Sequence, residues 1–452
     1  HHLPEWLHSD SAPNTLWEFI FSHALQSPTR PGERTARPLP QVVPLVPTLG
    51  YFAGVLGRPR SRWNPGMLAL YTLASGVGLK AYPSAAKELA IALSTTEGED
   101  DEFAVFLERK LSELPRAQRA EIDDAWLAPK LEWCRVPFRS EPAEPWSPAE
   151  AFARDLSELL GLKRKLTRRQ WCALIESLLR IGLAAHVLWV CRLTVVAWEH
   201  CLNILGGFPA PVSRELESQL WNGHIGQGAF LDSGQNADPY LRRQVESYTI
   251  ARLGINLLLN ALDDHGAGWC WPASVSEPSG LPAPEQLALF LEHLFTARHR
   301  FPKDPKGWII SQLGGVLDEQ ASRISGNAGT PKNLYEFLAY TLQRRRAREP
   351  SFKEHDQGYL LAKTSGASTA PWIVRPGPVL LLIMCYATCR SMPGVPATLQ
   401  HLASHLSFYG VRLSTGDLQE GIVARDLEAL GILVDSPDAG GGRLVLSPFE
   451  ER

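Results

Sequence analysis

The chain has 452 residues, of which 44% are hydrophobic and 21% are charged, and its net charge is −3. This composition is typical of globular proteins and excludes a chain that is disordered throughout. The near-neutral charge excludes a global positive field that attracts nucleic acid, so any such contact must come from local clusters. At about 150 residues per domain, we expect roughly two to four domains.

The cysteine pattern and the apolar stretches predict the compartment. Seven Cys residues without regular spacing favour a reducing environment over a disulfide framework. Charged residues interrupt the most apolar region, 171–208, and its longest uncharged run is about half a bilayer span, so no membrane segment is expected. The first residues lack the pattern of a secretory signal. We therefore expect a soluble, cytoplasmic protein, and because residue 1 is His rather than Met, we expect the native start to lie upstream.

Proline content and helical periodicity divide the chain into three expected regions. Residues 1–136 are rich in Pro and Trp, with a helical segment at DEFAVFLERKLSELP. Residues 147–349 are expected to form a central helical domain, and residues 372–452 a C-terminal domain. The Pro-rich segment before residue 147 and the segment 350–371 are predicted to be linkers.

Two capping signatures locate helices in the central region. Ser147, Pro148 and Glu150 predict a helix start, and the pair Thr167 and Gln170 predicts another that opens the long apolar stretch to Leu205. Further helices are predicted at about 213–222, 239–263, 284–297 and 331–348.

The last 75 residues or so follow a recognisable order of elements. We predict helices at Pro378–Cys389 and Thr398–Phe408, a short strand at Val411–Leu413, a helix at Ser414–Leu430 and a hairpin at Ile432–Leu446. On the third helix, Leu418, Ile422, Leu427 and Leu430 are predicted to face inward. This order resembles the winged-helix domain, in which the third helix enters a DNA groove and the hairpin touches the backbone. The expected fold is therefore mainly α and multi-domain, with a C-terminal winged helix; a small helical lobe with a hairpin edge is the alternative.

The charge of the third predicted helix opposes DNA binding. Its charged residues are Asp417, Glu420, Arg425, Asp426 and Glu428. Carboxylates are repelled by phosphates, and a helix that contacts bases normally presents Arg, Lys, Asn or Gln. Arg412 and Arg443 are the plausible phosphate contacts nearby. We therefore favour a winged helix that faces a protein.

Basic clusters elsewhere are the candidate nucleic-acid contacts. The predicted binding residues are Lys163, Arg164, Lys165, Arg168 and Arg169, then Arg344, Arg345, Arg346 and Arg348, and finally Arg443. A third group comprises Arg298, His299, Arg300, Lys303 and Lys306. A solvated linker explains the first cluster equally well, and favourable interaction with a helix C-terminus explains the second. On one common face, the three clusters would hold nucleic acid without base specificity.

Patterns that suggest chemistry are weak. A spacing close to that of a zinc finger is formed by Cys385, Cys389, His401 and His405. However, the two Cys residues are predicted to lie in an entirely apolar helix. The two His residues are predicted to lie on the next helix, on the face opposite its apolar stripe. Asp263, Asp264 and His265 are expected to be a solvated helix end. A metal-dependent nuclease is suggested by Asp123, Asp124, Lys130 and Glu132, since such enzymes combine carboxylates with a Lys. However, these residues lie in a predicted helical stretch, whereas a restriction-type nuclease core places them on strands. His186 and His200 are expected to be satisfied core residues. We predict no catalytic residues, no metal and no cofactor.

The favoured hypothesis is a non-catalytic subunit of a multi-protein complex acting on DNA. The winged helix would dock one or more protein subunits, and the basic clusters would contact the nucleic-acid backbone. In general appearance, the chain resembles the large helical accessory proteins of prokaryotic anti-phage and DNA-restriction operons, which implies a role in antiviral defence. A winged-helix transcriptional regulator is one alternative, and a metal-dependent nuclease whose site is assembled from distant residues is another.

Overall fold

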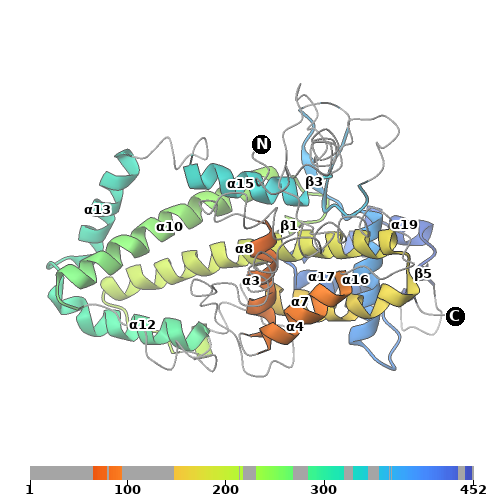
Figure 1. The fold of residues 1–452 in the computed structure, drawn as a ribbon. Coiled ribbons are helices and arrows are strands. Elements are labelled where there is room, and N and C mark those ends of the chain that lie inside the picture. The colour runs from red at the N-terminus through yellow and green to blue at the C-terminus, as the bar shows by residue number, and fades with distance from the viewer. Residues whose placement is uncertain are drawn as a thin grey trace, which may run out of the picture.

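The computed structural model is mainly helical and describes residues 65–78, 81–93, 147–212, 214–216, 231–267, 283–319, 329–344, 356–365, 367, 369–435 and 443–449 (Figure 1). Several predicted features lie outside the described residues: the helix in DEFAVFLERKLSELP, the nuclease-like set Asp123, Asp124, Lys130 and Glu132, most of the helix at 213–222, and the hairpin turn.

One long helix, α8 (Arg168–Leu205), runs through the described structure, and most other helices pack against it (Figure 1). It has 38 residues and is therefore about 57 Å long. The predicted capping box at its start is confirmed, since the Thr167 side chain accepts from the Gln170 N–H and the Gln170 side chain accepts from the Thr167 N–H. Buried residues occur all round α8 rather than on one stripe, as expected of a helix with neighbours on every side.

Helix α8 is long and apolar enough to span a membrane, and the central helix of a globular protein can have the same length and composition. Of its most apolar 18-residue window, 61% is buried against the rest of the protein. The buried Arg180 lies within α8, where partners from neighbouring segments satisfy its charge.

Helices α3 (Pro65–Val77) and α7 (Pro148–Gly161) pack on the first half of α8, and α4 (Tyr82–Leu93) packs on α3 and α7. The predicted cap of α7 is confirmed, because the Ser147 hydroxyl accepts from the Glu150 N–H. Helices α3 and α7 cross at Gly76, where a Cβ atom would lie 2.1 Å from the Ala149 carbonyl oxygen. Glycine at this position therefore sets the close approach of the two helices.

The other half of α8 carries a second hydrophobic cluster, formed with α10 (Asp238–Asp264), α12 (Ala283–Ala297) and α13 (Pro305–Glu319). The short 3-10 helix η6 (Arg298–Arg300) follows α12 and has no buried residue. Helices α10 and α12 confirm the predictions at 239–263 and 284–297. Trp198 of α8 packs against Gly254 of α10, where a Cβ atom would meet the indole at 2.6 Å. Burial of Cys201 in this cluster raises the pKa of its thiol to about 12.

The segment 350–371, predicted to be a linker, contains part of the core instead. Helix α15 (Gly329–Leu342) ends six residues earlier than predicted, and the chain returns through β2 (Leu361–Lys363), which pairs antiparallel with β3 (Trp372–Val374). Leu360 and Leu361 are buried. The linker prediction is wrong for this part because polar residues dominate the sequence of the segment. They obscured two apolar side chains, Leu360 and Leu361, that join the core, and the strand β2 that pairs with β3.

The C-terminal elements follow the predicted order, with two differences. They are α16 (Pro378–Ser391), α17 (Leu399–Ser407), β4 (Val411–Arg412), α18 (Thr415–Gln419), α19 (Ile422–Ala429), β5 (Leu433–Val434) and β6 (Leu444–Val445). First, β4 does not join the hairpin; it pairs in parallel with β1 (Leu231–Asp232), ahead of α10. The hairpin bonds instead to the segment before α17, through Leu399 N–H to Arg443 O and Val445 N–H to Ala397 O.

Second, the predicted helix Ser414–Leu430 is two helices. A Cβ atom at Gly421 would lie 2.4 Å from the Asp417 Cα, and Gly421 has an extended backbone, so the helix breaks there. The break changes the helical phase, and the prediction that Ile422 and Leu430 face inward is wrong. They are 41% and 37% exposed, whereas Val423, Ala424 and Leu427 are buried.

One hydrophobic cluster runs from α3 through α7 and α8 into the C-terminal elements, so it includes residues of all three expected regions. A buried polar contact joins the same parts. Asp155 of α7 accepts hydrogen bonds from His405 Nε2 of α17 at 2.8 Å and from the Tyr409 hydroxyl at 2.6 Å. Burial and the Asp155 charge raise the pKa of Tyr409 well above its usual value, so the phenol remains a donor.

We expect Asp155→Ala to lower the free energy of unfolding by roughly 2–5 kcal/mol, because two buried donors are left without an acceptor. Urea unfolding measures this change. Asp263→Ala, at the exposed end of α10, is the control and should shift stability by less than about 0.5 kcal/mol. Equal stability of the two variants would show that the contact does not hold α17 on α7.

Candidate functional site

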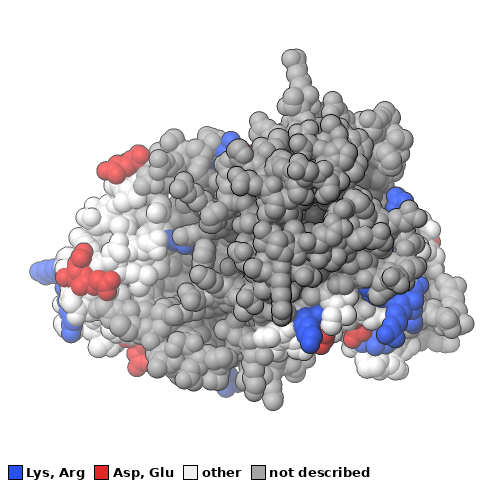
Figure 2. Space-filling model, in the orientation of Figure 1, with Lys and Arg blue, Asp and Glu red and all other residues white. Residues whose placement is uncertain are grey.

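The first basic cluster lies at the N-terminal end of α8, where α7 leads through the 3-10 helix η5 (Leu162–Lys165) into α8. Figure 2 shows Lys and Arg side chains gathered at the lower right of the molecule, where α7 and α8 meet. Arg164, Lys165 and Arg169 are exposed, and none of the three forms a hydrogen bond or ion pair with any residue that the structure describes. Their charges are therefore available to an external anion.

The other two cations of this cluster have structural roles. Arg168 is only 3% exposed, and its guanidinium donates to the Leu93 carbonyl at 2.5 Å, which ties α8 to the end of α4. The prediction that Arg168 contacts nucleic acid is wrong, because that side chain is inside the protein. The Lys163 ammonium is half-buried and lies 5.9 Å from the Trp171 ring centroid.

A pocket of about 320 Å³ opens beside this cluster, between α8, the segment 356–358 and the start of α16. Its lining passes from exposed residues, Arg169 and Gln170, to buried ones, Ser177, Arg180 and Asp356. Glu176 also lines it and is half-buried. The sequence by itself does not indicate this pocket, because part of its lining comes from the segment predicted to be a linker.

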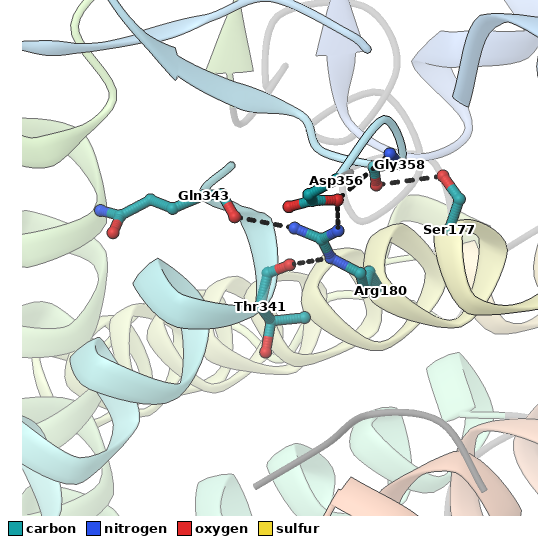
Figure 3. A network of polar contacts seen from close by, with 6 residues as sticks. All are labelled: Ser177, Arg180, Thr341, Gln343, Asp356 and Gly358. Atoms are coloured by element: carbon teal, nitrogen blue, oxygen red, sulfur yellow. Dashed lines mark hydrogen bonds and ion pairs between the residues drawn. The ribbon is translucent and has the colours of Figure 1, made fainter. Parts of the chain in front are cut away.

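Arg180 lies at the buried end of the pocket and donates hydrogen bonds to three partners (Figure 3). Arg180 donates from Nη1 to the Asp356 carboxylate, from Nε to the Thr341 carbonyl and from Nη2 to the Gln343 carbonyl, each at 2.7 Å. The two carbonyls lie at the C-terminal end of α15, so the guanidinium also caps that helix. Arg180 and Asp356 are 3% and 5% exposed, and each balances the charge of the other.

Two glycines let the segment 356–358 approach its neighbours closely. The Ser177 hydroxyl donates to the Gly358 carbonyl at 3.1 Å, and a Cβ atom at Gly358 would lie 2.8 Å from the Ser177 Cβ (Figure 3). A Cβ atom at Gly377, just before α16, would lie 2.3 Å from the Gln357 carbonyl oxygen. The shape of the pocket therefore depends on backbone contacts as well as on the ion pair.

The arginines of the C-terminal lobe, residues 372–449, contrast with those at the end of α8. The structure describes five, and four form ion pairs: Arg375 with Asp426, Arg390 with Glu158, Arg412 with Asp232, and Arg443 with Glu428 and Asp435. Arg443 and Arg412, which were predicted as phosphate contacts, therefore hold the hairpin to α19 and β4 to β1. Within the described residues, Arg425 is the one arginine of this lobe without such a pair.

The same ion pairs change the charge assigned to the third helix. Asp426 and Glu428 are neutralised by Arg375 and Arg443, and Asp417 accepts from the Ser414 backbone and hydroxyl in a capping box. The acidic character counted along the helix therefore overstates the negative field of the folded lobe. Glu420 and Arg425 remain exposed on this surface.

The remaining basic groups do not extend the cluster at the start of α8. Helix α15 ends before Arg344, whose guanidinium lies 5.2 Å from the Tyr359 ring centroid; Arg345, Arg346 and Arg348 lie outside the described residues. The group from Arg298 to Lys306 lies at the opposite end of α8, since Lys306 reaches the Gly206 position that follows α8. The first and third groups therefore lie at opposite ends of α8.

The sequence patterns that suggested chemistry are explained by structural contacts. Cys385 is buried, and this raises the pKa of its thiol, which disfavours the thiolate that binds zinc. His401 caps α17 by accepting from the Thr398 N–H. His405 is buried on Asp155, so its predicted position opposite the apolar stripe is wrong. Among the described residues, no group of three or more His, Cys, Asp and Glu could hold a metal ion.

Two other histidine predictions have defined outcomes. Asp263, Asp264 and His265 are exposed at the end of α10, where the His265 ring packs edge-on against Phe301 and Trp308. His186 is buried, as predicted, and stacks on Trp189, but its Nδ1 has no hydrogen-bond partner among the described residues. Burial lowers the pKa of His186 to about 4, so the ring is neutral at pH 7.

Comparison with known proteins gave no relative. The chain matches no protein-family model, no curated protein and no solved structure.

We expect Arg180→Met to lower the free energy of unfolding by about 3–5 kcal/mol, because Asp356 becomes an unpaired buried charge. Urea unfolding of Arg180→Met, Asp356→Asn and the double variant forms a double-mutant cycle. The destabilisation of the double variant should fall short of the sum of the two single effects by at least about 1 kcal/mol. Arg169→Met, in the exposed part of the pocket, is the control and should be neutral within about 0.5 kcal/mol. Additive effects would show that the ion pair does not organise the pocket.

Proposed function

We propose that this chain is a non-catalytic subunit of a multi-protein complex that acts on DNA. Its C-terminal lobe, as a winged helix, docks a protein partner, and the basic end of α8 contacts the nucleic-acid backbone. The observation that carries the proposal is the distribution of unpaired cations. Arg164, Lys165 and Arg169 at the start of α8 are exposed and have no ion-pair partner among the described residues, whereas the lobe that resembles a DNA-binding domain has four of its five described arginines in ion pairs.

The order of elements in the lobe supports the winged-helix proposal. The segment at Ala397–Leu399 bonds to the hairpin and lies between α16 and α17, so the order is helix, extended segment, helix, split helix and hairpin. An extended segment at this point, bonded to the wing, is compatible with a winged helix, whereas β4 belongs to the contact with β1. Fold alone does not specify function, and the surface of the lobe must indicate the partner.

The exposed face of α19 favours a protein partner. Ile422, Leu430 and the β5 residue Val434 are large apolar side chains that are 41%, 37% and 41% exposed. Aliphatic side chains on this face offer no hydrogen bonds to base edges, but they are suited to burial in a protein interface. Glu420, Arg425 and Glu428 are exposed polar residues of the same segment, and they would form the polar rim of such an interface.

The biological setting that we propose is prokaryotic anti-phage defence or DNA restriction. It is supported only by the general resemblance to the helical accessory proteins of such systems. The docking face and the basic end lie on different parts of the chain, so one subunit could bind a partner and DNA together.

The nucleic-acid contact is tested by a triple variant, Arg164→Glu, Lys165→Glu and Arg169→Glu. Fluorescence anisotropy with a duplex of about 30 base pairs at several salt concentrations should show weaker binding. The slope of log K against log salt should become shallower by about 0.9 for each phosphate that the variant no longer neutralises.

Two matched charge reversals are the controls for this experiment. Lys303→Glu removes an exposed cation at the far end of α8, and Arg425→Glu removes the unpaired arginine on α19; both should leave the affinity unchanged. Weak binding by Arg425→Glu, with full binding by the triple variant, would favour a DNA-reading winged helix and a transcriptional regulator.

The docking face is tested by Ile422→Glu together with Val434→Glu. If these side chains are central to an interface, the affinity of the double variant for proteins that co-purify with the wild-type chain should fall at least about 30-fold. Ile310→Glu is the matched control, because Ile310 is 46% exposed on α13. Quantitative pull-down, with equal thermal stability of all variants verified first, is the measurement. Equal recovery of partners by the three proteins would place the interface elsewhere.

A further inference from the structure

We infer that the pocket beside the start of α8 binds a terminal phosphate monoester, either at the end of a nucleic-acid strand or on a free nucleotide. This inference rests on the proposed function, because it takes the basic end of α8 as the surface that meets nucleic acid. It adds the chemical group that enters the pocket and the residue that recognises it.

The shape of the pocket favours an end group over a continuous strand. The lining begins at the exposed Arg169 and ends at the buried Arg180 and Asp356, which are fixed by the network in Figure 3. A backbone that continued in both directions would need an exit at that buried end. A pocket of about 320 Å³ with a buried ion pair in its lining therefore suits a terminal group or a small molecule.

The chemistry of the lining favours phosphate over a base. Among the described lining residues, there is no aromatic side chain on which a base could stack. The lining instead offers donors of the kind that phosphate oxygens accept, the Arg169 guanidinium and the Gln170 side-chain amide. Arg169 also belongs to the exposed cluster, so it connects the pocket with the surface proposed to hold the backbone.

Two carboxylates, those of Asp356 and Glu176, also line the pocket, and a carboxylate near a phosphate would repel it. Asp356 is paired with Arg180, and the formal charges of Glu176 and Arg169 are equal and opposite, so the formal charges of these four lining side chains sum to zero. The adjacent Arg164 and Lys165 are exposed and unpaired among the described residues, and they add positive charge on the approach to the pocket. The field at the entrance therefore attracts an anion, while the buried ion pair stays neutral.

The test compares two single strands of about 20 nucleotides with the same sequence, labelled at the 3′ end, one with a 5′-phosphate and one with a 5′-hydroxyl. We expect the wild-type chain to bind the phosphorylated strand about tenfold more tightly in fluorescence anisotropy, the effect of one good charge-assisted contact. A third strand with the phosphate at the other end distinguishes the two ends. Competition by adenosine monophosphate and by inorganic phosphate distinguishes a strand terminus from a free ligand. If either competitor binds as tightly as the phosphorylated strand and displaces it, the pocket is a phosphate site for a free ligand.

Three variants assign the preference to the pocket. Arg169→Ala removes the proposed recognition residue, and Ala173→Phe fills the pocket from an exposed position on α8, so that neither change disturbs the core. Both should abolish the preference for the phosphorylated strand. Lys165→Ala, outside the pocket, should weaken binding of both strands by the same factor.

Three results would overturn the inference, and they differ in what they say of the proposed function. Equal binding of all strands by the wild-type chain, with a salt-dependent affinity, overturns the phosphate site and leaves the backbone contact intact. Failure of every strand and of the duplex to bind overturns both. A phosphate preference that survives in Ala173→Phe also overturns the assignment to this pocket.

Discussion

The burial of α8 is the constraint on which the rest of the described structure depends. A 38-residue helix that is apolar on all sides is stable in water only when other elements surround it. Helices α3, α7, α15 and α16 cover the first half, and α10, α12 and α13 cover the second. Helix α10 contributes to both hydrophobic clusters, and the C-terminal lobe belongs to the first of them.

Polar contacts fix the orientation of the elements that hydrophobic burial brings together. Apolar packing is not directional, so it tolerates small rotations and shifts of neighbouring helices. Arg180 of α8 bonds both to the end of α15 and to Asp356, and Asp155 accepts from two side chains at and beyond the end of α17. Because an unpaired buried charge or donor is costly, these contacts favour one arrangement over its near alternatives.

Ion pairing, rather than the number of basic residues, determines where an anion can bind on this surface. Arg443 and Arg412 lie on the lobe that resembles a DNA-binding domain, yet their guanidinium groups contact carboxylates of the same chain. Arg164, Lys165 and Arg169 have no such partners within the described residues, and Arg169 lines the pocket at this end of α8. The ion pairs on the lobe are partly exposed and individually weak, but phosphates bound there would have to replace them. The end of α8 requires no such exchange.

The sequence by itself determined the features that depend on neighbours along the chain. The caps at Ser147 and Thr167 are confirmed, as is the order of elements after Pro378, because capping and helical periodicity act over a few residues. Contacts between distant segments were decided only by the tertiary structure: the burial of Arg168 against Leu93, and the pairing of Arg180 with Asp356. The tertiary structure also decided that the Ile422 side chain is exposed, because the helix breaks at Gly421. Periodicity treats a helix as continuous and a charge as solvated, so it does not register a partner that is far away in the sequence.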